Sequence, residues 1–92
     1  MDHVTWDPEK DRLNQAKHGI SFAEAHATLI HTLTRDWPDP DHSRDEPRTA
    51  AIGSMPNGWV IVIVTAVATE GSIRIISARR ATKRERHAYQ DD

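Results

Sequence analysis

Cysteine is absent from this 92-residue chain. Disulfide bonds and thiolate metal sites are therefore excluded, and a reducing compartment, the cytoplasm, is the expected location. The first residues hold no basic segment followed by an apolar one, and the longest apolar stretch, 59–68, is too short to cross a bilayer. We therefore expect a soluble, unexported protein with no membrane contact.

Several motifs of cofactor and metal sites are also missing. The sequence contains no Gly-rich phosphate loop and no G-x-S-x-G elbow. Of the six histidines, His26 and His31 are five residues apart, so they do not share one face of a helix, and no H-x-x-x-H pair occurs. We expect neither a cofactor nor a metal site.

Length and composition favour a single domain spanning residues 1–92. The chain is 37% hydrophobic and 28% charged, close to the averages for globular proteins, and it has no internal repeat. A core of this size rarely leaves a stability surplus above about 5 kcal/mol, so burial against a partner would add useful stability.

Two helices are predicted near the amino end, after a short strand at Val4–Trp6. The segment Asp7-Pro8-Glu9 is typical of a helix start and Gly19 of a helix end, which predicts a helix from Pro8 to about His18. Next, Ser21-Phe22-Ala23-Glu24 has the form of a capping box and opens a second amphipathic helix. We expect these two helices to pack as a hairpin.

The rest of the chain reads mainly as sheet. Strands are predicted in 31–37, 49–54, 59–67 and 72–78, with turns at Asn57-Gly58 and Glu70-Gly71 and a long loop through Pro47. A last helix, 82–90, begins at Thr82 with Glu85 three residues later. The order β-α-α-β-β-β-β-α predicts an α+β fold with two N-terminal helices on an antiparallel meander and a short C-terminal helix.

Charge is distributed unevenly along the chain. Residues 1–72 hold six Lys/Arg and eleven Asp/Glu, a net charge of −5, whereas 73–92 hold six and three, a net charge of +3. Arg79 and Arg80 follow a buried strand, where rigid backbone lets a guanidinium hold phosphate through two hydrogen bonds. Lys83, Arg84 and Arg86 add looser attraction. The alternative is a solvated helix balanced by an acidic surface.

Two further places carry candidate residues. Lys17 and His18 close the first helix, where a histidine can transfer protons and a lysine can stabilise a phosphorane, although cations also commonly complement a helix C-terminus. Arg48 begins a strand after the loop of ionisable residues 41–48, and such loops are often functional. A structural ion pair between Arg48 and Glu46 is the alternative.

Blocks along nearly the whole chain resemble one family, the BrnT toxins. They are Trp6-Asp7 with Asn14, the run 17–25 (KHGISFAEA), Glu46-Pro47-Arg48, Gly53, the run 73–82 (IRIISARRAT), and Glu85-Arg86 with Tyr89. The resemblance implies a RelE-like ribonuclease fold and a type II toxin that cleaves RNA, inhibits translation and arrests growth. It also implies a BrnA-like ribbon-helix-helix antitoxin, in a hetero-oligomer that binds operator DNA.

Carried over by position, the resemblance implies a metal-independent endoribonuclease site. Its catalytic residues would be Lys17, His18, Arg48, Arg79 and Arg80, with His18 as the proton-transfer group. The further RNA-binding residues would be Arg74, Lys83, Arg84, Arg86 and Tyr89. Two other functions stay open: a non-catalytic module that binds an antitoxin-like partner and contributes to operator binding, and a metal-dependent nuclease.

Overall fold

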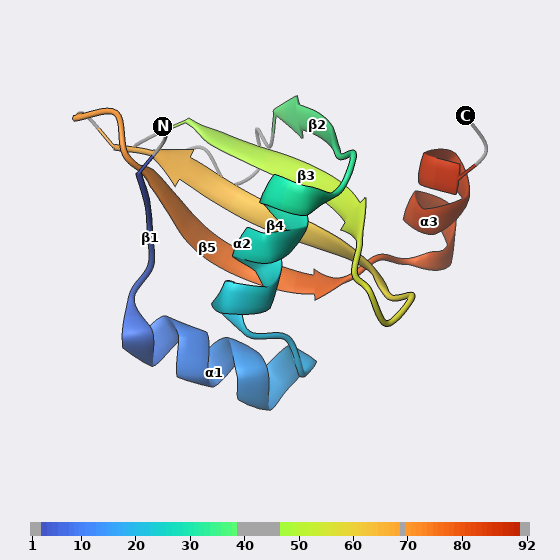
Figure 1. The fold of residues 1–92 in the computed structure, drawn as a ribbon, viewed down its shortest axis with the longest axis horizontal. Helices are drawn as coiled ribbons and strands as arrows, with labels where there is room; N and C mark the ends of the chain where they lie inside the picture. The colour runs from blue at the N-terminus through green and yellow to red at the C-terminus, as the bar shows by residue number, and fades with distance from the viewer. Residues whose placement is uncertain (1–2, 39–46, 69, 91–92) are drawn as a thin grey trace.

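The computed structural model describes residues 3–38, 47–68 and 70–90. These residues form three helices and a five-stranded sheet in the predicted order (Figure 1). None of the helices in these ranges has the length and apolar character needed to span a bilayer. In chain order the elements are β1 (Val4–Thr5), α1 (Pro8–His18), α2 (Phe22–His31), β2 (Arg35–Pro38), β3 (Arg48–Ser54), β4 (Val60–Val67), β5 (Ile73–Arg80) and α3 (Lys83–Gln90).

The sheet has the strand order β1-β5-β4-β3-β2. Strands β2 to β5 form the predicted antiparallel meander. The short β1 adds to the outside of β5 in parallel, with Val4 opposite Ile73, so the whole sheet is mixed. Most of the predicted loop before β3, residues 39–46, lies outside the described residues.

The predicted helix ends are confirmed by their capping bonds. Oδ1 of Asp7 accepts the N–H of Glu9 at 2.8 Å, and Gly19 has a φ of 71°, the left-handed conformation that ends a helix without steric strain. The capping box of Ser21 and Glu24 is complete at the start of α2. Local sequence therefore fixes both ends of α1 and the start of α2.

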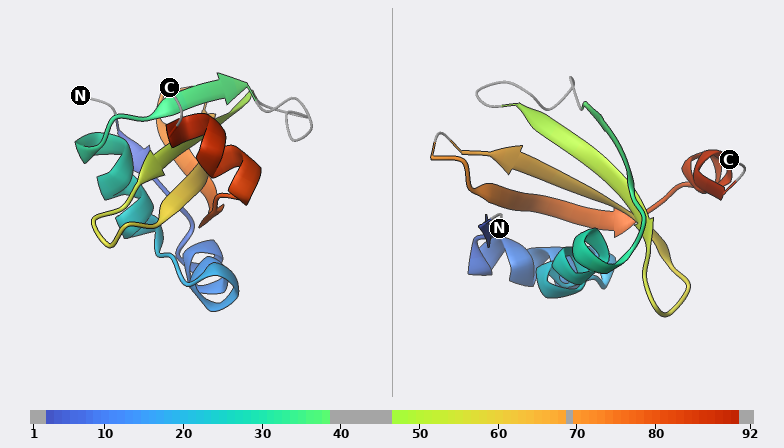
Figure 2. Two further views of the ribbon diagram at one scale, coloured as in Figure 1. Left: turned by 90° about the vertical axis from the view of Figure 1, so that its right-hand side faces the viewer. Right: turned by 45° about the horizontal axis from the view of Figure 1, so that its top comes forward.

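Helices α1 and α2 cover one face of the sheet, here called the helix face (Figure 2). They cross steeply instead of running antiparallel as a hairpin (Figure 1). The carboxylate of Asp11 joins them by accepting the free N–H of Phe22 at 2.9 Å. Each helix packs on the sheet, and α3 lies on the opposite side, at the end of β5 (Figure 2). We call that side the α3 face.

The sheet separates two hydrophobic cores, so the central strand β4 is buried on both faces as its sequence predicts. On the helix face, Phe22 and Ile20 pack against Ile61 and Ile63. On the α3 face, a smaller cluster formed by β3 and β4 is covered by Ala81 and Tyr89. The α3 face is the thinner layer, because α3 contributes no fully buried residue.

Candidate nucleic-acid interface

Side chains cross the α3 face in rows, because paired residues of antiparallel strands point to the same side of a sheet. The first row is Arg35, Ile52, Val62 and Arg79; the second is Trp37, Ala50, Val64 and Ser77; the third is Arg48, Ala66 and Arg74. Arginines thus stand around an apolar floor. Along β4 the first and third rows are four residues apart, roughly 13 Å.

A β-bulge brings Arg74 to this face. Val64 pairs with Ser77 and Thr65 pairs with Ile75, so Ile76 is the extra residue on β5. Because of this shift, Ile75 points into the core on the helix face. Arg74 then points to the α3 face, beside the buried Ala66, which is only 1% exposed. The structure therefore brings together three of the predicted cations, Arg48, Arg74 and Arg79.

Arg79 forms a two-bonded ion pair with the first turn of α3. Its Nη1 and Nη2 donate to Oε1 and Oε2 of Glu85 at 2.8 and 2.9 Å. This arrangement holds the pKa of Glu85 down to about 2, chiefly through the hydrogen bond from Arg79. A phosphate offers the same pair of acceptor oxygens. The Arg79 guanidinium is therefore held in a geometry suited to phosphate.

Glu85 also caps α3. Its Oε1 accepts the N–H of Thr82 at 2.8 Å, while Oγ1 of Thr82 accepts the N–H of Glu85 at 3.1 Å. The predicted start of the last helix is thereby confirmed. One carboxylate thus joins the helix start to the arginine at the end of β5.

Arg80 points to the other side of the sheet. It pairs with Ile61, a residue of the helix-face core, and its Cζ lies 4.3 Å from the centroid of the Trp59 ring. A guanidinium over an indole is held by a cation–π attraction. Because β5 extends through Arg80, beyond the predicted strand end at Ala78, Arg79 and Arg80 stand on opposite faces and do not approach one phosphate from the same side.

Lys17 and His18 lie beside β5, at the end of α1. They line a shallow cavity of about 230 Å³ together with Ile76 and Ser77. The buried Asn14 fixes this position: its Nδ2 donates to the carbonyl of Ala78 at 2.9 Å and its Oδ1 accepts the N–H of Ala78 at 3.2 Å. These two residues are therefore separated from Arg79 by the edge of β5.

Tyr89 attaches α3 to the α3 face. Its hydroxyl donates to the carbonyl of Leu33 at 2.9 Å and its ring packs against the small core. Of the cations predicted on α3, Arg84 faces a cavity between the helix and β2, whereas Lys83 is exposed in the first turn and Arg86 is half-buried. Tyr89 has a structural task in addition to the predicted RNA contact.

Sequence reasoning did not point to Arg35, Trp37 or the pairing role of Glu85. Arg35 and Trp37 line the same cavity as Arg84. Arg35 and Trp37 are two residues apart in a predicted strand, and this spacing alone indicates that their side chains share one face of the sheet. The pairing of β2 with β3 was needed to show which face that is.

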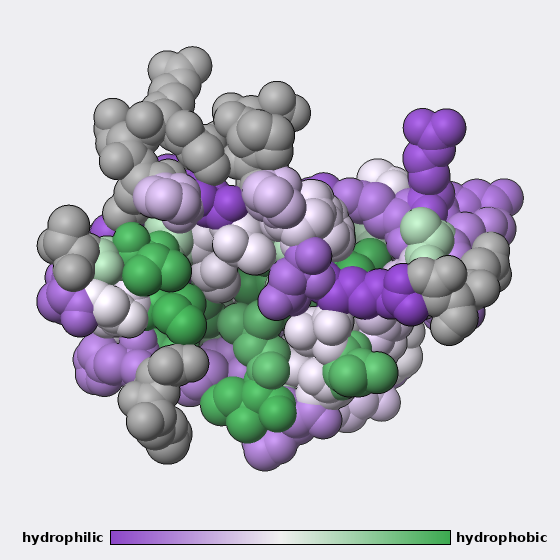
Figure 3. All heavy atoms as spheres, turned by 90° about the horizontal axis from the view of Figure 1, so that it is seen from above, coloured by the Kyte–Doolittle hydropathy of each residue, from purple (hydrophilic) through white to green (hydrophobic). Residues whose placement is uncertain are grey.

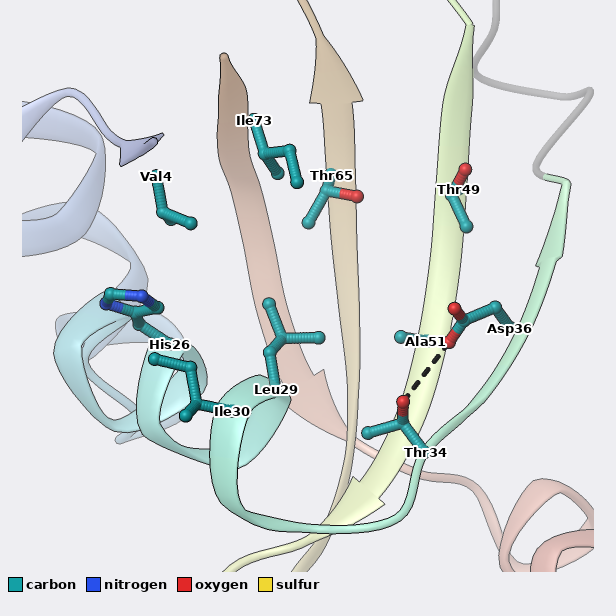
Figure 4. A pocket seen from close by; sticks show the side chains of 10 residues that line it. All are labelled: Val4, His26, Leu29, Ile30, Thr34, Asp36, Thr49, Ala51, Thr65 and Ile73. Atoms are coloured by element: carbon teal, nitrogen blue, oxygen red, sulfur yellow. Dashed lines mark hydrogen bonds between the residues drawn. The ribbon is translucent and has the colours of Figure 1, made fainter. Parts of the chain in front are cut away.

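Besides these two cavities, a hollow lies on the helix face, between α2 and the sheet. It has a volume of about 500 Å³, and its lining, drawn in Figure 4, contains neither arginine nor lysine among the described residues. Thr34 Oγ1 donates to Asp36 Oδ1 at its rim, at 3.4 Å. Seen from above, apolar residues gather in the middle of the molecule and hydrophilic ones at the α3 end (Figure 3). The predicted cations Arg48, Arg74 and Arg79 stand on the α3 face, on the other side of the sheet from this apolar hollow.

Comparison with known families decides the identity. The sequence model of one protein family, described as "Ribonuclease toxin, BrnT, of type II toxin-antitoxin system", matches residues 6–85. The chain belongs to the BrnT family. The family is described as one of ribonuclease toxins of type II toxin-antitoxin systems, so membership implies RNA as the substrate class and an antitoxin as partner. The matched span contains every predicted site residue except Arg86 and Tyr89.

The fold agrees with this family. The chain is similar to the crystal structure of the ribonuclease toxin BrnT from Brucella abortus, with 24% sequence identity and a TM-score of 0.69. The match covers 90% of this chain and all of the other. No curated protein sequence matches this chain. The α+β fold implied by the BrnT resemblance is therefore confirmed.

The family residues that the sequence singled out fall into three places. Arg48, Arg74 and Arg79 share the α3 face, Lys17 and His18 lie along the edge of β5, and Arg80 is stacked on Trp59. Within the described ranges, the structure holds no cluster of three histidine or acidic side chains that suits a metal ion. The α3 face is thus the strongest candidate for binding RNA phosphates.

Proposed function

We propose that this BrnT-family chain is a metal-independent endoribonuclease that cleaves RNA on its α3 face and thereby inhibits translation and growth. The observation that carries the proposal is the convergence of Arg48, Arg74 and Arg79 on one face, with the Arg79 fork already held in a two-bonded geometry. Three cations over an apolar floor suit a polyanion whose bases are unpaired.

The reaction follows from RNA chemistry. The ribose 2′-oxygen attacks the adjacent phosphorus, the bond to the 5′-oxygen breaks, and a 2′,3′-cyclic phosphate and a 5′-hydroxyl remain. A base takes the proton of the 2′-hydroxyl and an acid returns one to the leaving oxygen. Arg79 binds the phosphate and stabilises the extra negative charge of the transition state, and Arg48, two rows away, binds a phosphate further along the chain. Arg74, Lys83, Arg84, Arg86 and Tyr89 hold the flanking chain.

Lys17, His18 and Arg80 form a second group of candidates. They lie on the helix side of the β5 edge, so RNA bound at Arg79 would have to pass over that edge to reach them. In this arrangement His18 transfers the proton and Lys17 adds positive charge. If a His18→Ala variant keeps full activity, another group transfers the proton, and the proposed phosphate site at the arginines is unaffected by that result.

The partner completes the proposal. A BrnA-like ribbon-helix-helix antitoxin neutralises the toxin, and the hetero-oligomer binds operator DNA. Support comes from membership of a type II toxin-antitoxin family. Because translation takes place in the cytoplasm, the toxin acts there.

The test compares Arg79→Lys with Arg12→Lys. Lysine keeps the positive charge but loses the fork, and Arg12 is an exposed arginine whose carboxylate partner is Glu9, so it is a matched control. We expect Arg79→Lys to lower cleavage of single-stranded RNA by about 100-fold or more, the usual cost of one transition-state donor. Arg12→Lys should match wild type. Growth arrest on expression should follow the same order.

Two outcomes would contradict this proposal. Unchanged mRNA across a range of protein doses in cell-free translation would favour the non-catalytic interaction module. Loss of cleavage in EDTA, with recovery on adding Mg²⁺ or Mn²⁺, would favour a metal-dependent nuclease. Circular dichroism of each variant separates a lost site from a lost fold.

A further inference from the structure

We propose that the cavity between α3 and β2 binds one unpaired nucleobase of the RNA, with Trp37 as the stacking surface. This inference rests on the proposed function and concerns the nucleotide next to the phosphate at Arg79. The cavity has a volume of about 360 Å³ and is lined by Arg35, Trp37, Ile52, Arg84, Glu85, Ala88 and Tyr89.

Strand pairing explains how the cavity forms. Trp37 pairs with Ala50 and Arg35 with Ile52, so both side chains rise from β2 on the α3 face. Tyr89 forms the opposite wall, fixed by its hydrogen bond to the carbonyl of Leu33. The edge strand and α3 thus stand as two walls over a floor from β3.

The lining suits a flat ring with a polar edge. Trp37 is 39% exposed, although it is a large apolar residue, so its surface is open to solvent. Bases of single-stranded RNA are recognised by stacking on aromatic rings and on arginine planes. Arg35 and Arg84 line the same cavity and add positive charge that attracts the sugar-phosphate chain. Ile52 and Ala88 contribute the apolar contact.

The cavity is joined to the phosphate site. Glu85 lines it and is the carboxylate that pairs with Arg79. Ile52, on the cavity floor, and Arg79 belong to one row, two strand spacings or roughly 10 Å apart. A base in the cavity therefore belongs to a nucleotide close to the phosphate that Arg79 binds.

The size and charge of the cavity favour a nucleobase over a protein segment. A volume of 360 Å³ is near the lower end of the range for small-ligand sites, about 300–1,000 Å³, and so accommodates a single ring system. An amphipathic helix of a partner needs a longer groove that takes several anchor side chains in series. Two arginines at the cavity also match a polyanion.

The test combines Trp37→Leu with abasic RNA. Leucine keeps an apolar side chain on β2 but removes the aromatic surface, and Val67→Leu is the control, because Val67 is 50% exposed at the far end of the sheet. A short RNA with a single cleavage site is made intact and with one abasic ribose at each position around that site. Cleavage rates are measured, together with the affinity for the same RNAs carrying 2′-O-methyl groups, which bind but cannot be cleaved.

In the wild type and in Val67→Leu, removing one base next to the cleaved bond should weaken cleavage and binding by about 5-fold to 150-fold, the range of one base–aromatic stack. In Trp37→Leu the intact and abasic RNAs should behave alike. Trp37→Phe, which retains a ring, should recover most of the difference. Thermal melting must show that all variants are folded.

Other results overturn the inference. Equal sensitivity to the abasic position in wild type and in Trp37→Leu refutes the base site while leaving the nuclease intact. If Trp37→Leu cleaves normally but no longer binds the antitoxin, the cavity belongs to the protein partner. Wild-type protein that cleaves no RNA refutes the proposed function, yet Trp37-dependent binding of intact over abasic RNA would still support the base site.

Discussion

Replacing Glu85 by glutamine should weaken the fold and strengthen RNA binding. The carboxylate of Glu85 accepts two hydrogen bonds from the Arg79 guanidinium, at 2.8 and 2.9 Å, as a phosphate would. The same carboxylate also caps α3. Glutamine is nearly the same size and still accepts a hydrogen bond, but it carries no charge. Glu85→Gln should therefore lower the stability of the fold but raise the affinity for RNA. A carboxylate with a purely structural role would give the loss of stability without the gain in affinity.

The stability loss can be bounded from the exposure of the pair. The Arg79 and Glu85 side chains are 39% and 25% exposed, which places the pair between surface pairs, about 0–1 kcal/mol, and buried pairs that lose a partner, about 3–5 kcal/mol. We expect Glu85→Gln to lower the free energy of unfolding by about 1–2 kcal/mol, measured by urea denaturation.

The loss should depend on pH. The pKa of Glu85 in the folded protein is lowered from 4.5 to about 2, so its charge stabilises the folded state above pH 4.5. That contribution disappears as the pH falls from about 4.5 towards 2, because protonation then favours the unfolded chain. Wild type and Glu85→Gln should accordingly differ in stability at pH 7 and converge at pH 2.

The gain in RNA affinity comes from removing a competing negative charge. Two like charges about 6 Å apart repel by roughly 1–3 kcal/mol at effective dielectric constants of about 20–60. We expect Glu85→Gln to bind a 2′-O-methyl RNA about 5-fold to 150-fold more tightly at low salt, measured by fluorescence anisotropy. The gain should shrink at 1 M salt, where the screening length is about 3 Å.

Glu85→Gln combined with Arg79→Lys serves as the control. If Glu85 competes with phosphate for Arg79, removing its charge should help much less once the fork is lost, since lysine makes a weaker phosphate contact. Lower RNA affinity in the Glu85→Gln single variant, with the same loss of stability, would refute the competition. Glu85 would then act by positioning Arg79.

Two further predictions concern the residues that place the layers. Asn14→Ala leaves the buried backbone groups of Ala78 without their side-chain partner and should cost about 2–4 kcal/mol in urea unfolding; a loss under about 1 kcal/mol would mean that water replaces these bonds. Gly53→Ala puts a methyl group 3.0 Å from Cγ2 of Thr34 and should cost about 1–3 kcal/mol, partly restored by Thr34→Ser, which lacks that methyl; no restoration would place the clash elsewhere.

Local sequence signals accounted for most of the fold. Asp7, Ser21 and Thr82 mark helix starts through side-chain bonds to nearby N–H groups, so these boundaries depend on residues only two or three positions away. The parallel pairing of β1 with β5 joins residues about seventy positions apart, Val4 and Ile73, and no local signal encodes it. The steep crossing of α1 and α2 likewise depends on packing over the sheet.

The candidate site was harder to predict for the same reason. Strict alternation in β5 would place Arg74 with Arg80, and the bulge at Ile76 moves it to the side of Arg79 instead. Residue 76 is isoleucine, not the glycine that marks some β-bulges, so the local sequence does not predict this bulge. Arg35 reaches the same row as Arg79 through two intervening strands, so its membership of the site depends on the whole register of the meander.

A net charge of −2 is compatible with RNA binding because, among the described residues, arginines gather on one face of the sheet. The acidic residues of the first turns of α1 and α2, Glu9, Asp11 and Glu24, belong to the layer that covers the helix face. Four arginines stand in rows on the α3 face. At 0.15 M salt, charges are screened beyond about 8 Å, so a phosphate at Arg79 responds mainly to nearby groups. Glu85, the carboxylate bonded to Arg79, therefore matters more for RNA affinity than the acidic balance of the whole chain.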